Sequence, residues 1–196
     1  MTTLLHVTRR RFLGVTTLVL LALSLVGTAA VANPHARDAD QQRSLAQVRA
    51  ATARYHDVSV AEAAGYVPVS PCVEEPGLGA MGIHYLNHDL LVDGVLDPAA
   101  PELLLYLPNE HGRLRLVGVE YLQVDEDQDL ATDDDRPWLF GVPFDGPMDG
   151  HGPGEPVHYD LHVWIWSHNP AGTFAAWNPA LSCPAVPGHP APHVGH

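Results

Sequence analysis

The sequence predicts an α+β fold in which N-terminal helices pack on a mostly antiparallel sheet. Between residues 38 and 64, apolar side chains recur every three or four positions, which is the spacing of amphipathic helices. After residue 68 the chain changes to short stretches rich in β-branched and aromatic residues, separated by proline and glycine. Because the helices come first and the strands follow as a block, we expect antiparallel connections within one sheet.

Two helices are expected before the strands. In the first, over residues 38–56, Leu45, Val48 and Tyr55 share one face. The second is short, covers residues 60–64 and ends at a glycine. Both are expected to pack against the sheet and to contribute no ligands.

The strand region is expected to begin with a strand over residues 81–87. A hairpin of residues 103–107 and 113–124 follows, joined by the turn P-N-E-H-G. An acidic loop, residues 125–135, and a loop rich in glycine and proline, residues 141–156, come next.

The last strand, predicted over residues 157–166, has the sequence V-H-Y-D-L-H-V-W-I-W. Alternate residues of a strand point to opposite faces of its sheet. One face would carry the largely apolar side chains of Tyr159, Leu161, Val163 and Ile165. The other would carry His158, Asp160, His162, Trp164 and Trp166. Imidazoles, a carboxylate and indoles on one face predict one wall of a metal site or of a ligand-binding cleft.

Three candidate metal ligands lie on three different predicted strands: His84, Glu120 and His162. Glu120 lies in the apolar segment L-V-G-V-E-Y-L, where a buried carboxylate needs a donor, a cation or a metal as its partner. Two imidazoles with one carboxylate suit a divalent transition metal (Zn, Fe, Mn or Cu). His158 is a fourth candidate ligand. Asp160 and His151 are expected beside the site, Asp160 as the acceptor that orients an imidazole.

The acidic loop, D-E-D-Q-D-L-A-T-D-D-D, matches the opening of an EF-hand calcium loop. However, Leu130 takes the place of the glycine at position six, and Arg136 that of the glutamate at position twelve. The EF-hand pattern therefore fails, and a solvated acidic loop is favoured over a weak calcium site.

The first 32 residues have the pattern of a twin-arginine signal peptide. T-R-R-R-F-L precedes an uncharged run that ends in A-V-A, as at a signal-peptidase site. The run is also just long enough to be an uncleaved membrane anchor. We predict cleavage, export to the periplasm or the extracellular space, a single domain over residues 33–184 and a disordered Pro/His tail over residues 185–196.

Composition limits the partners of the chain. It has no lysine, ten arginines and 23 acidic residues, and three of the arginines but none of the acids lie in the predicted signal peptide. A surface this acidic argues against nucleic acid or an anionic membrane as a partner. We expect no stable membrane insertion after cleavage, and the oligomeric state stays open.

The two cysteines, Cys72 and Cys183, are predicted to form a disulfide, which an oxidising compartment allows. The even count and the lack of a C-x-x-C motif favour this pairing over a metal thiolate. Closing so long a loop stabilises a fold by about 4 kcal/mol in the chain-entropy account.

Seven segments together resemble a family of exported bacterial proteins to which no function is assigned. They are A-A-T-A-R-Y-H-D, S-P-C-V, G-A-M-G-I-H-Y, V-G-V-E-Y, G-P-M-D-G-H, H-Y-D-L-H-V-W-I-W and N-P-A-G-T-F-A-A-W-N-P. The resemblance covers nearly the whole mature chain. It implies an exported single domain and provides no catalytic residues.

The sequence thus predicts an exported, single-domain metal-binding protein and leaves open whether it is a metal-dependent enzyme. An alternative is a non-catalytic exported protein that binds a small molecule or a glycan with the His/Trp face of residues 157–166. A third is a structural envelope protein whose histidines and Glu120 hydrogen-bond to one another.

Overall fold

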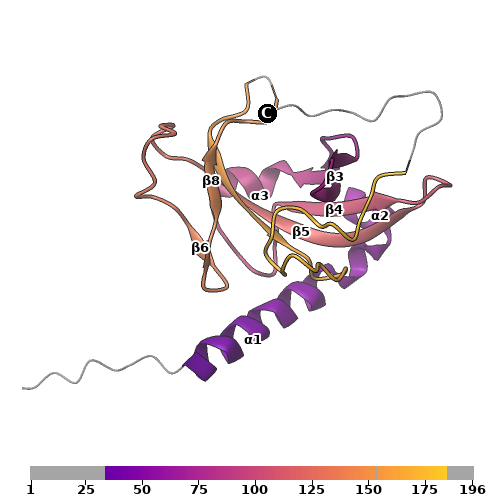
Figure 1. Ribbon diagram of the computed structural model, residues 1–196, viewed down its shortest axis with the longest axis horizontal. Coiled ribbons are helices and arrows are strands. Elements are labelled where there is room, and N and C mark those ends of the chain that lie inside the picture. Colours follow the sequence, from indigo (N-terminus) through magenta and orange to yellow (C-terminus); the bar gives the residue numbers. More distant parts are fainter. Residues whose placement is uncertain (1–33, 153, 185–196) are drawn as a thin grey trace, which may run out of the picture. The chain divides into compact units, whose positions relative to one another are not determined.

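The computed structural model describes residues 34–152 and 154–184 (Figure 1). The predicted signal peptide and C-terminal tail lie outside these residues. Helix α1 (Pro34–Thr52) continues into a short 3-10 helix, η1 (Ala53–His56), and α2 (Val58–Ala63) follows. Both expected helices are therefore confirmed. Within the described ranges, no helix is long and apolar enough to cross a membrane.

The strands form one large antiparallel sheet and a small separate ribbon. They are β1 (Tyr66–Pro68), β2 (Val73–Glu75), β3 (Gly79–Asn87), β4 (Leu103–Pro108), β5 (Leu114–Val124), β6 (Trp138–Leu139), β7 (Val142–Pro143), β8 (Asp145–Met148) and β9 (His158–Val163). The order in the large sheet is β1-β3-β4-β5-β9-β8, β2 also pairs with β3, and β6 with β7 forms the ribbon. Every strand pair is antiparallel, which confirms the predicted α+β class.

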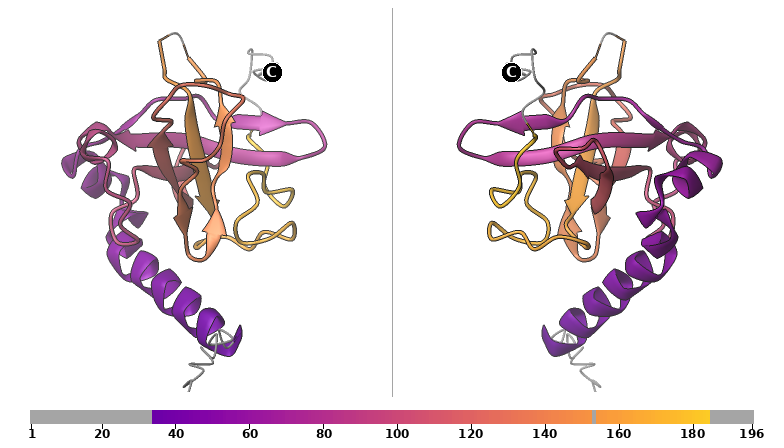
Figure 2. Two further views of the ribbon diagram at one scale, coloured as in Figure 1. Left: turned by 90° about the vertical axis from the view of Figure 1, so that its left-hand side faces the viewer. Right: turned by 90° about the vertical axis from the view of Figure 1, so that its right-hand side faces the viewer.

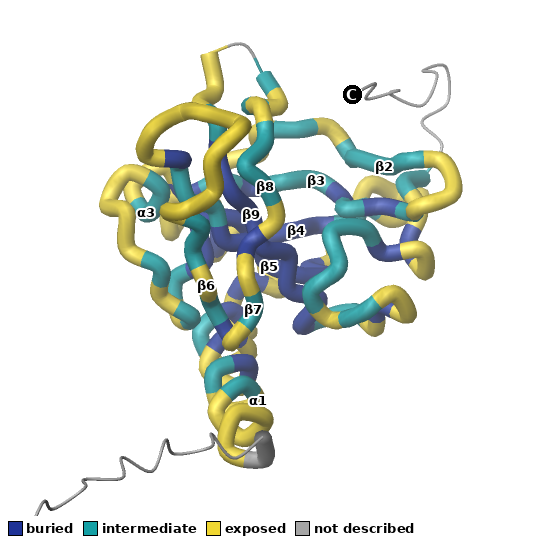
Figure 3. Tube along the Cα trace, turned by 60° about the vertical axis from the view of Figure 1, so that its left-hand side comes forward, coloured by how far each residue is buried: buried dark blue, intermediate teal, exposed yellow. Residues whose placement is uncertain are grey.

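The helices cover one face of the sheet and build the main core. Leu45 and Val48 of α1 and Tyr55 of η1 belong to the same buried cluster as side chains of β4, β5 and β9. The three central strands are mostly buried along their length (Figure 3). Since β9 is buried at all its positions, the face opposite the helices is covered as well.

The C-terminal segment, residues 168–184, covers part of that opposite face (Figure 2). Ala80 and Asn178 exchange backbone hydrogen bonds of 3.2 and 3.3 Å. Gly79 beside them has φ +101°, and a Cβ there would lie 2.1 Å from the Asn178 carbonyl oxygen, so this approach requires glycine. The predicted disulfide between Cys72 and Cys183 is confirmed, with a Cα–Cα distance of 5.9 Å, and it ties this segment to the sheet.

The structure differs from the prediction at several elements. The loop predicted over residues 141–156 contains the strands β7 and β8, and β8 pairs with β9. Strand β9 ends at Val163, three residues before the predicted end, because the Ile165 amide donates to the Val163 carbonyl oxygen (2.8 Å) instead of to β5. The Trp166 amide takes the Val117 carbonyl oxygen of β5 in its place (3.3 Å), so the pairing slips by one residue. After β3 the chain forms helix α3 (His88–Asp93), which was not predicted. The Asn87 side chain caps α3 by accepting hydrogen bonds from the first backbone amides of the helix.

Candidate metal centre

Three strands bring the candidate ligands together on the face of the sheet opposite the helices. Glu120 of β5 pairs directly with His162 of β9. His84 lies on β3 and pairs with Leu105 of β4, which in turn pairs with Gly118, two residues before Glu120. Since residues two apart on a strand share a face, all three side chains lie on the same side of the sheet.

One ligand-type atom of each of these residues lies within 4.8 Å of those of the other two, so the group could hold a metal ion. Nε2 of His84 is 3.3 Å from Oε2 of Glu120, and Nε2 of His162 is 3.8 Å from the same oxygen. The side chains are 13% exposed for His84, 4% for Glu120 and 1% for His162. The predicted cluster therefore exists, and it is enclosed, with its contact to solvent mainly at His84.

The cluster contains buried polar atoms without partners. Among the described residues, Oε2 of Glu120 and both ring nitrogens of His162 have no hydrogen-bond partner. Each such atom costs about 1–3 kcal/mol when it is removed from water. A cation bound between the two imidazoles and the carboxylate would satisfy Oε2 of Glu120 and Nε2 of His162 at once.

The hydroxyl of Ser70 determines which nitrogen of His84 faces Glu120. It donates to the Pro71 carbonyl oxygen (2.8 Å) and accepts from the His84 backbone amide (3.0 Å). Its oxygen is also 3.0 Å from Nδ1 of His84. With the hydroxyl proton given to the Pro71 carbonyl oxygen, the contact of Ser70 with His84 requires a proton on Nδ1, and the lone pair of Nε2 then faces Glu120.

Asp160 takes the corresponding position beside His162. Its Oδ1 lies 3.7 Å from Nδ1 of His162, and its side chain is 6% exposed. The distance is that of an ion pair and exceeds that of a hydrogen bond. Asp160 thus has the position predicted for the residue that orients an imidazole. In both histidines Nε2 faces Glu120, while Nδ1 faces an oxygen of Ser70 (His84) or of Asp160 (His162).

The charges in the cluster are strongly coupled. Burial, reinforced by the charge of His162, lowers the pKa of His84 to about 3. Burial also raises the pKa of Glu120 to about 7, although His162 opposes this shift. For His162, burial favours the neutral ring, but Glu120 and Asp160 outweigh it and raise the pKa to about 9. At neutral pH, a metal-free cluster therefore holds an imidazolium at His162 between two carboxyl groups and a neutral imidazole at His84.

His158 is not part of the cluster, contrary to the prediction. It lies four residues before His162 on β9, which is about 13 Å along a strand. Its Nδ1 lies 3.1 Å from the Pro156 carbonyl oxygen, and its ring meets that of His151 edge to face, with centroids 5.0 Å apart. The side chains of His158 and His151 thus form a separate pair.

The two tryptophans predicted beside the site have different positions. The ring of Trp164 is stacked on that of His162, with centroids 6.3 Å apart, and its Nε1 donates to the Ala175 carbonyl oxygen. Trp166 lies on the helix side of the sheet, because the Trp166 amide takes the Val117 carbonyl oxygen of β5 (3.3 Å) and the alternation slips by one residue. Its Nε1 donates to Thr52 Oγ1 of α1 (3.0 Å), so Trp166 packs with the helices and does not line the site.

Three relevant residues were not predicted. No pattern in the sequence indicated Ser70, because its contact with His84 joins residues that are 14 positions apart in the chain. Asp145 of β8 pairs with Asp160, and its charge contributes to the raised pKa of His162. Glu102 precedes the apolar run of β4, is 1% exposed, and accepts a hydrogen bond from the Leu122 amide. A carboxylate next to an apolar run, the pattern that identified Glu120, could have indicated Glu102.

Comparison of the chain with protein-family models, with curated proteins and with solved structures gave no match. The resemblance of its motifs to exported bacterial proteins therefore stays a prediction.

Proposed function

We propose that this protein binds one divalent transition-metal ion through His84, Glu120 and His162. One observation carries the proposal: the imidazoles of His84 and His162, on different strands, both direct Nε2 at the same buried oxygen of Glu120. The second ring nitrogen, Nδ1, faces an oxygen of Ser70 in His84 and an oxygen of Asp160 in His162. Histidine ligands of metals are commonly held in this way by a partner on the second nitrogen.

The ligand types favour Zn²⁺, Fe²⁺, Mn²⁺ or Cu²⁺ over Ca²⁺ and Mg²⁺, which prefer oxygen ligands. Three protein ligands leave coordination positions for water or a small substrate. If the protein is an enzyme, the metal would polarise a substrate, generate hydroxide or, as iron or copper, activate oxygen. Because the three side chains are at most 13% exposed, we expect any substrate that reaches the metal to be small.

The glycan-binding alternative has less support. Taken as whole residues, His158, Asp160, His162 and Trp164 are each at most 4% exposed, so they do not line an open cleft. The indole nitrogens of Trp164 and Trp166 both donate within the protein, so neither is free for a ligand. The purely structural alternative requires mutual hydrogen bonds, but the two contacts of His162 are 3.8 and 3.7 Å long.

The test is the metal content of mature protein, residues 33–196, measured by inductively coupled plasma mass spectrometry after expression with its signal peptide. We expect near-stoichiometric transition metal in the wild type and little in His162→Ala. His88→Ala is the matched control, because His88 is exposed on α3 and should leave the metal content unchanged. Metal-free wild type whose Tm is the same with and without chelator would disprove the proposal.

We also propose export by the twin-arginine route. The disulfide between Cys72 and Cys183 supports export, since such bonds persist in oxidising compartments. Replacing both Arg9 and Arg10 by lysine should retain the precursor in the cytoplasm. Unchanged export of that variant would exclude the route and leave the metal proposal unaffected.

A further inference from the structure

The acidic loop, residues 125–135, contains a second buried carboxyl group without a partner. Asp125 is 1% exposed, and among the described residues neither of its carboxyl oxygens has a hydrogen-bond partner. Seven of the eleven residues of the loop are acidic and none is basic. An unpartnered carboxyl group inside such a loop is a feature that a solvated loop does not require.

The carboxylate of Asp135 lies beside Asp125, because it accepts from the backbone amide of Glu126, the next residue along the chain. Burial, reinforced by the charge of Asp135, raises the pKa of Asp125. Asp135 is held as an acceptor, because its Oδ2 accepts from the Glu126 amide (2.9 Å) and its Oδ1 from the Tyr159 hydroxyl (2.8 Å). These two donors keep the pKa of Asp135 low. The carboxyl group of Asp125 therefore lies next to a carboxylate that stays charged.

Gln128 fixes the base of the loop. Its side-chain amide donates to the carbonyl oxygens of Asp125 and Val157, and its side-chain oxygen accepts from the Val157 amide (2.9 Å). The Asp125 amide donates to the Val157 carbonyl oxygen (2.9 Å). The backbone that carries Asp125 is thus tied to the start of β9, and its carboxyl group is pre-positioned.

Two other aspartates of the loop serve its turns. Asp127 accepts from the Asp129 amide (2.9 Å) and from the Thr132 hydroxyl (2.8 Å). Asp129 accepts from the Ala131 amide (3.0 Å). Asp127 and Asp129, at the third and fifth EF-hand positions, therefore shape the loop, whereas Asp125 and Asp135 lie at its two ends.

We propose that Asp125 and Asp135 are ligands of a calcium ion bound at the acidic loop. The available atoms are all oxygens, which suit a hard cation and distinguish this site from the imidazole cluster around Glu120. Ca²⁺ tolerates irregular geometry and completes its coordination with carbonyl oxygens and water, whereas Mg²⁺ requires a near-ideal octahedron. With two carboxylate ligands, we expect an affinity on the order of 10⁻⁴–10⁻³ M, as in extracellular calcium modules.

The experiment is a calorimetric titration of Ca²⁺ into metal-depleted mature protein, residues 33–196, with Mg²⁺ as a second titrant. We expect one calcium site, much weaker binding of Mg²⁺ and loss of the calcium heat in Asp125→Asn. The variant should fold, because an asparagine amide can donate to Asp135. Asp134→Asn, which removes an exposed charge from the same loop, is the matched control and should retain binding.

A shared proton between Asp125 and Asp135 is the competing explanation. It predicts no calcium heat in the wild type, and that result would overturn the proposal, as would equal binding by Asp125→Asn. An equal loss of calcium binding in Asp125→Asn and Asp134→Asn would show that calcium is attracted only by the total charge of the loop, and would also overturn the proposal. His162→Ala should keep its calcium site, so failure here and failure of the transition-metal proposal can be told apart.

Discussion

Nδ1 of His84 lies 3.0 Å from the hydroxyl oxygen of Ser70, and Nε2 of the same ring lies 3.3 Å from Oε2 of Glu120. With the hydroxyl proton given to Pro71, Nδ1 donates to Ser70 and the lone pair of Nε2 faces Glu120. Without the contact with Ser70, either nitrogen of His84 could carry the proton, and the ring would lose an anchor. The metal centre thus depends on a residue outside the three strands that carry its ligands.

Ser70→Ala should therefore lower the affinity for the transition metal by about tenfold, the lower end of the range for partners of metal-bound histidines. Global stability should fall by about 1 kcal/mol, the usual net value of a hydrogen bond. Competition titration against a chromophoric chelator measures the affinity. Ser182→Ala, at an exposed serine, is the control; equal affinities in both variants would show that Ser70 does not orient His84.

Metal binding should depend steeply on pH, because the metal must displace protons. With the pKa of His162 raised to about 9, one proton leaves on binding between pH 9 and 7, and affinity should fall about tenfold per pH unit as pH decreases. Below pH 7 the carboxyl of Glu120, with a pKa of about 7, also binds a proton, and the fall should approach about 100-fold per unit.

The measurement is the apparent dissociation constant at pH 6, 7, 8 and 9, together with proton release in buffers of different ionisation enthalpy. His84 should add no step in this range, since its pKa is lowered to about 3. A pH-independent affinity would contradict the coupling of His162 to Glu120 and Asp160.

Glu102 should make the protein less stable at alkaline pH. Burial raises its pKa to about 8, so its folded-state pKa lies above the ordinary value of 4.5. The neutral carboxyl is tolerated below pH 4.5, and stability is lost as pH rises from 4.5 through 8. Glu102→Gln removes the ionisation and keeps an oxygen for the Leu122 amide. It should raise the free energy of unfolding at pH 8 by about 2–4 kcal/mol and leave it nearly unchanged at pH 4.5.

Urea unfolding of metal-free protein at the two pH values checks this prediction. Glu62→Gln, at an exposed position of α2, is the matched control and should give similar curves to the wild type. An equal increase in the free energy of unfolding at both pH values would indicate that the glutamine packs better, and would contradict the removal of a buried charge as the cause.

The sequence was sufficient to predict which side of each strand the metal ligands occupy. Alternation along β5 and β9 places Glu120 and His162 on the polar face of their strands, and the antiparallel pairing of the two strands then puts them opposite each other. The approach of His84 was not predictable in the same way. It depends on the register across β4, where a bulge between Leu105 and Tyr106 shifts the pairing, and such registers are set by the whole sheet.

The error at Trp166 has a local physical cause. Alternation holds only while the register of the ladder is kept, and the register slips at Ile165, whose amide donates to the Val163 carbonyl oxygen while the Trp166 amide takes the Val117 carbonyl oxygen of β5. Residues beyond that point no longer follow the period of two. The contact of Ser70 with His84 is tertiary, and no periodic pattern in the sequence encodes it.

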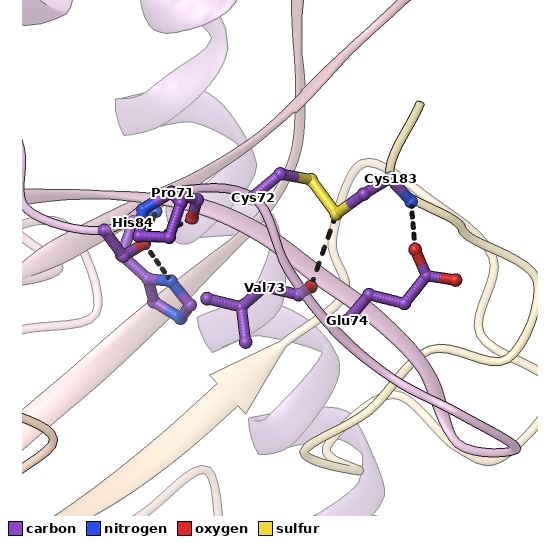
Figure 4. Close-up of a disulfide and its surroundings, with 7 residues drawn as sticks. Pro71, Cys72, Val73, Glu74, His84 and Cys183 are labelled. Atoms are coloured by element: carbon purple, nitrogen blue, oxygen red, sulfur yellow. Dashed lines mark hydrogen bonds between the residues drawn. A yellow bond between two sulfur atoms is a disulfide. The ribbon is translucent and has the colours of Figure 1, made fainter. Parts of the chain in front are cut away.

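The disulfide should couple the metal centre to the C-terminal segment. Cys72 lies two residues after Ser70, and its bond to Cys183 holds that part of the chain near His84 (Figure 4). The Cys183 amide also donates to Oε2 of Glu74 (2.8 Å), which keeps part of the attachment after reduction. Replacing both cysteines by serine should lower the free energy of unfolding by about 4 kcal/mol, as expected for a closed loop of more than 100 residues. It should also lower metal affinity, because the segment that carries Ser70 becomes less constrained.

Urea unfolding and chelator competition of the double variant, each with and without metal, separate the two effects. Saturating metal should restore part of the lost stability, since a ligand that binds only the folded state stabilises it by mass action. Ser70→Ala combined with the double cysteine variant tests the coupling directly. If the disulfide acts through Ser70, the triple variant should bind metal no more weakly than the weaker of its two parents, because the same contact has been removed twice. Additive losses would show that the disulfide supports the site by another route, and unchanged affinity in the double variant would show that it does not support the site at all.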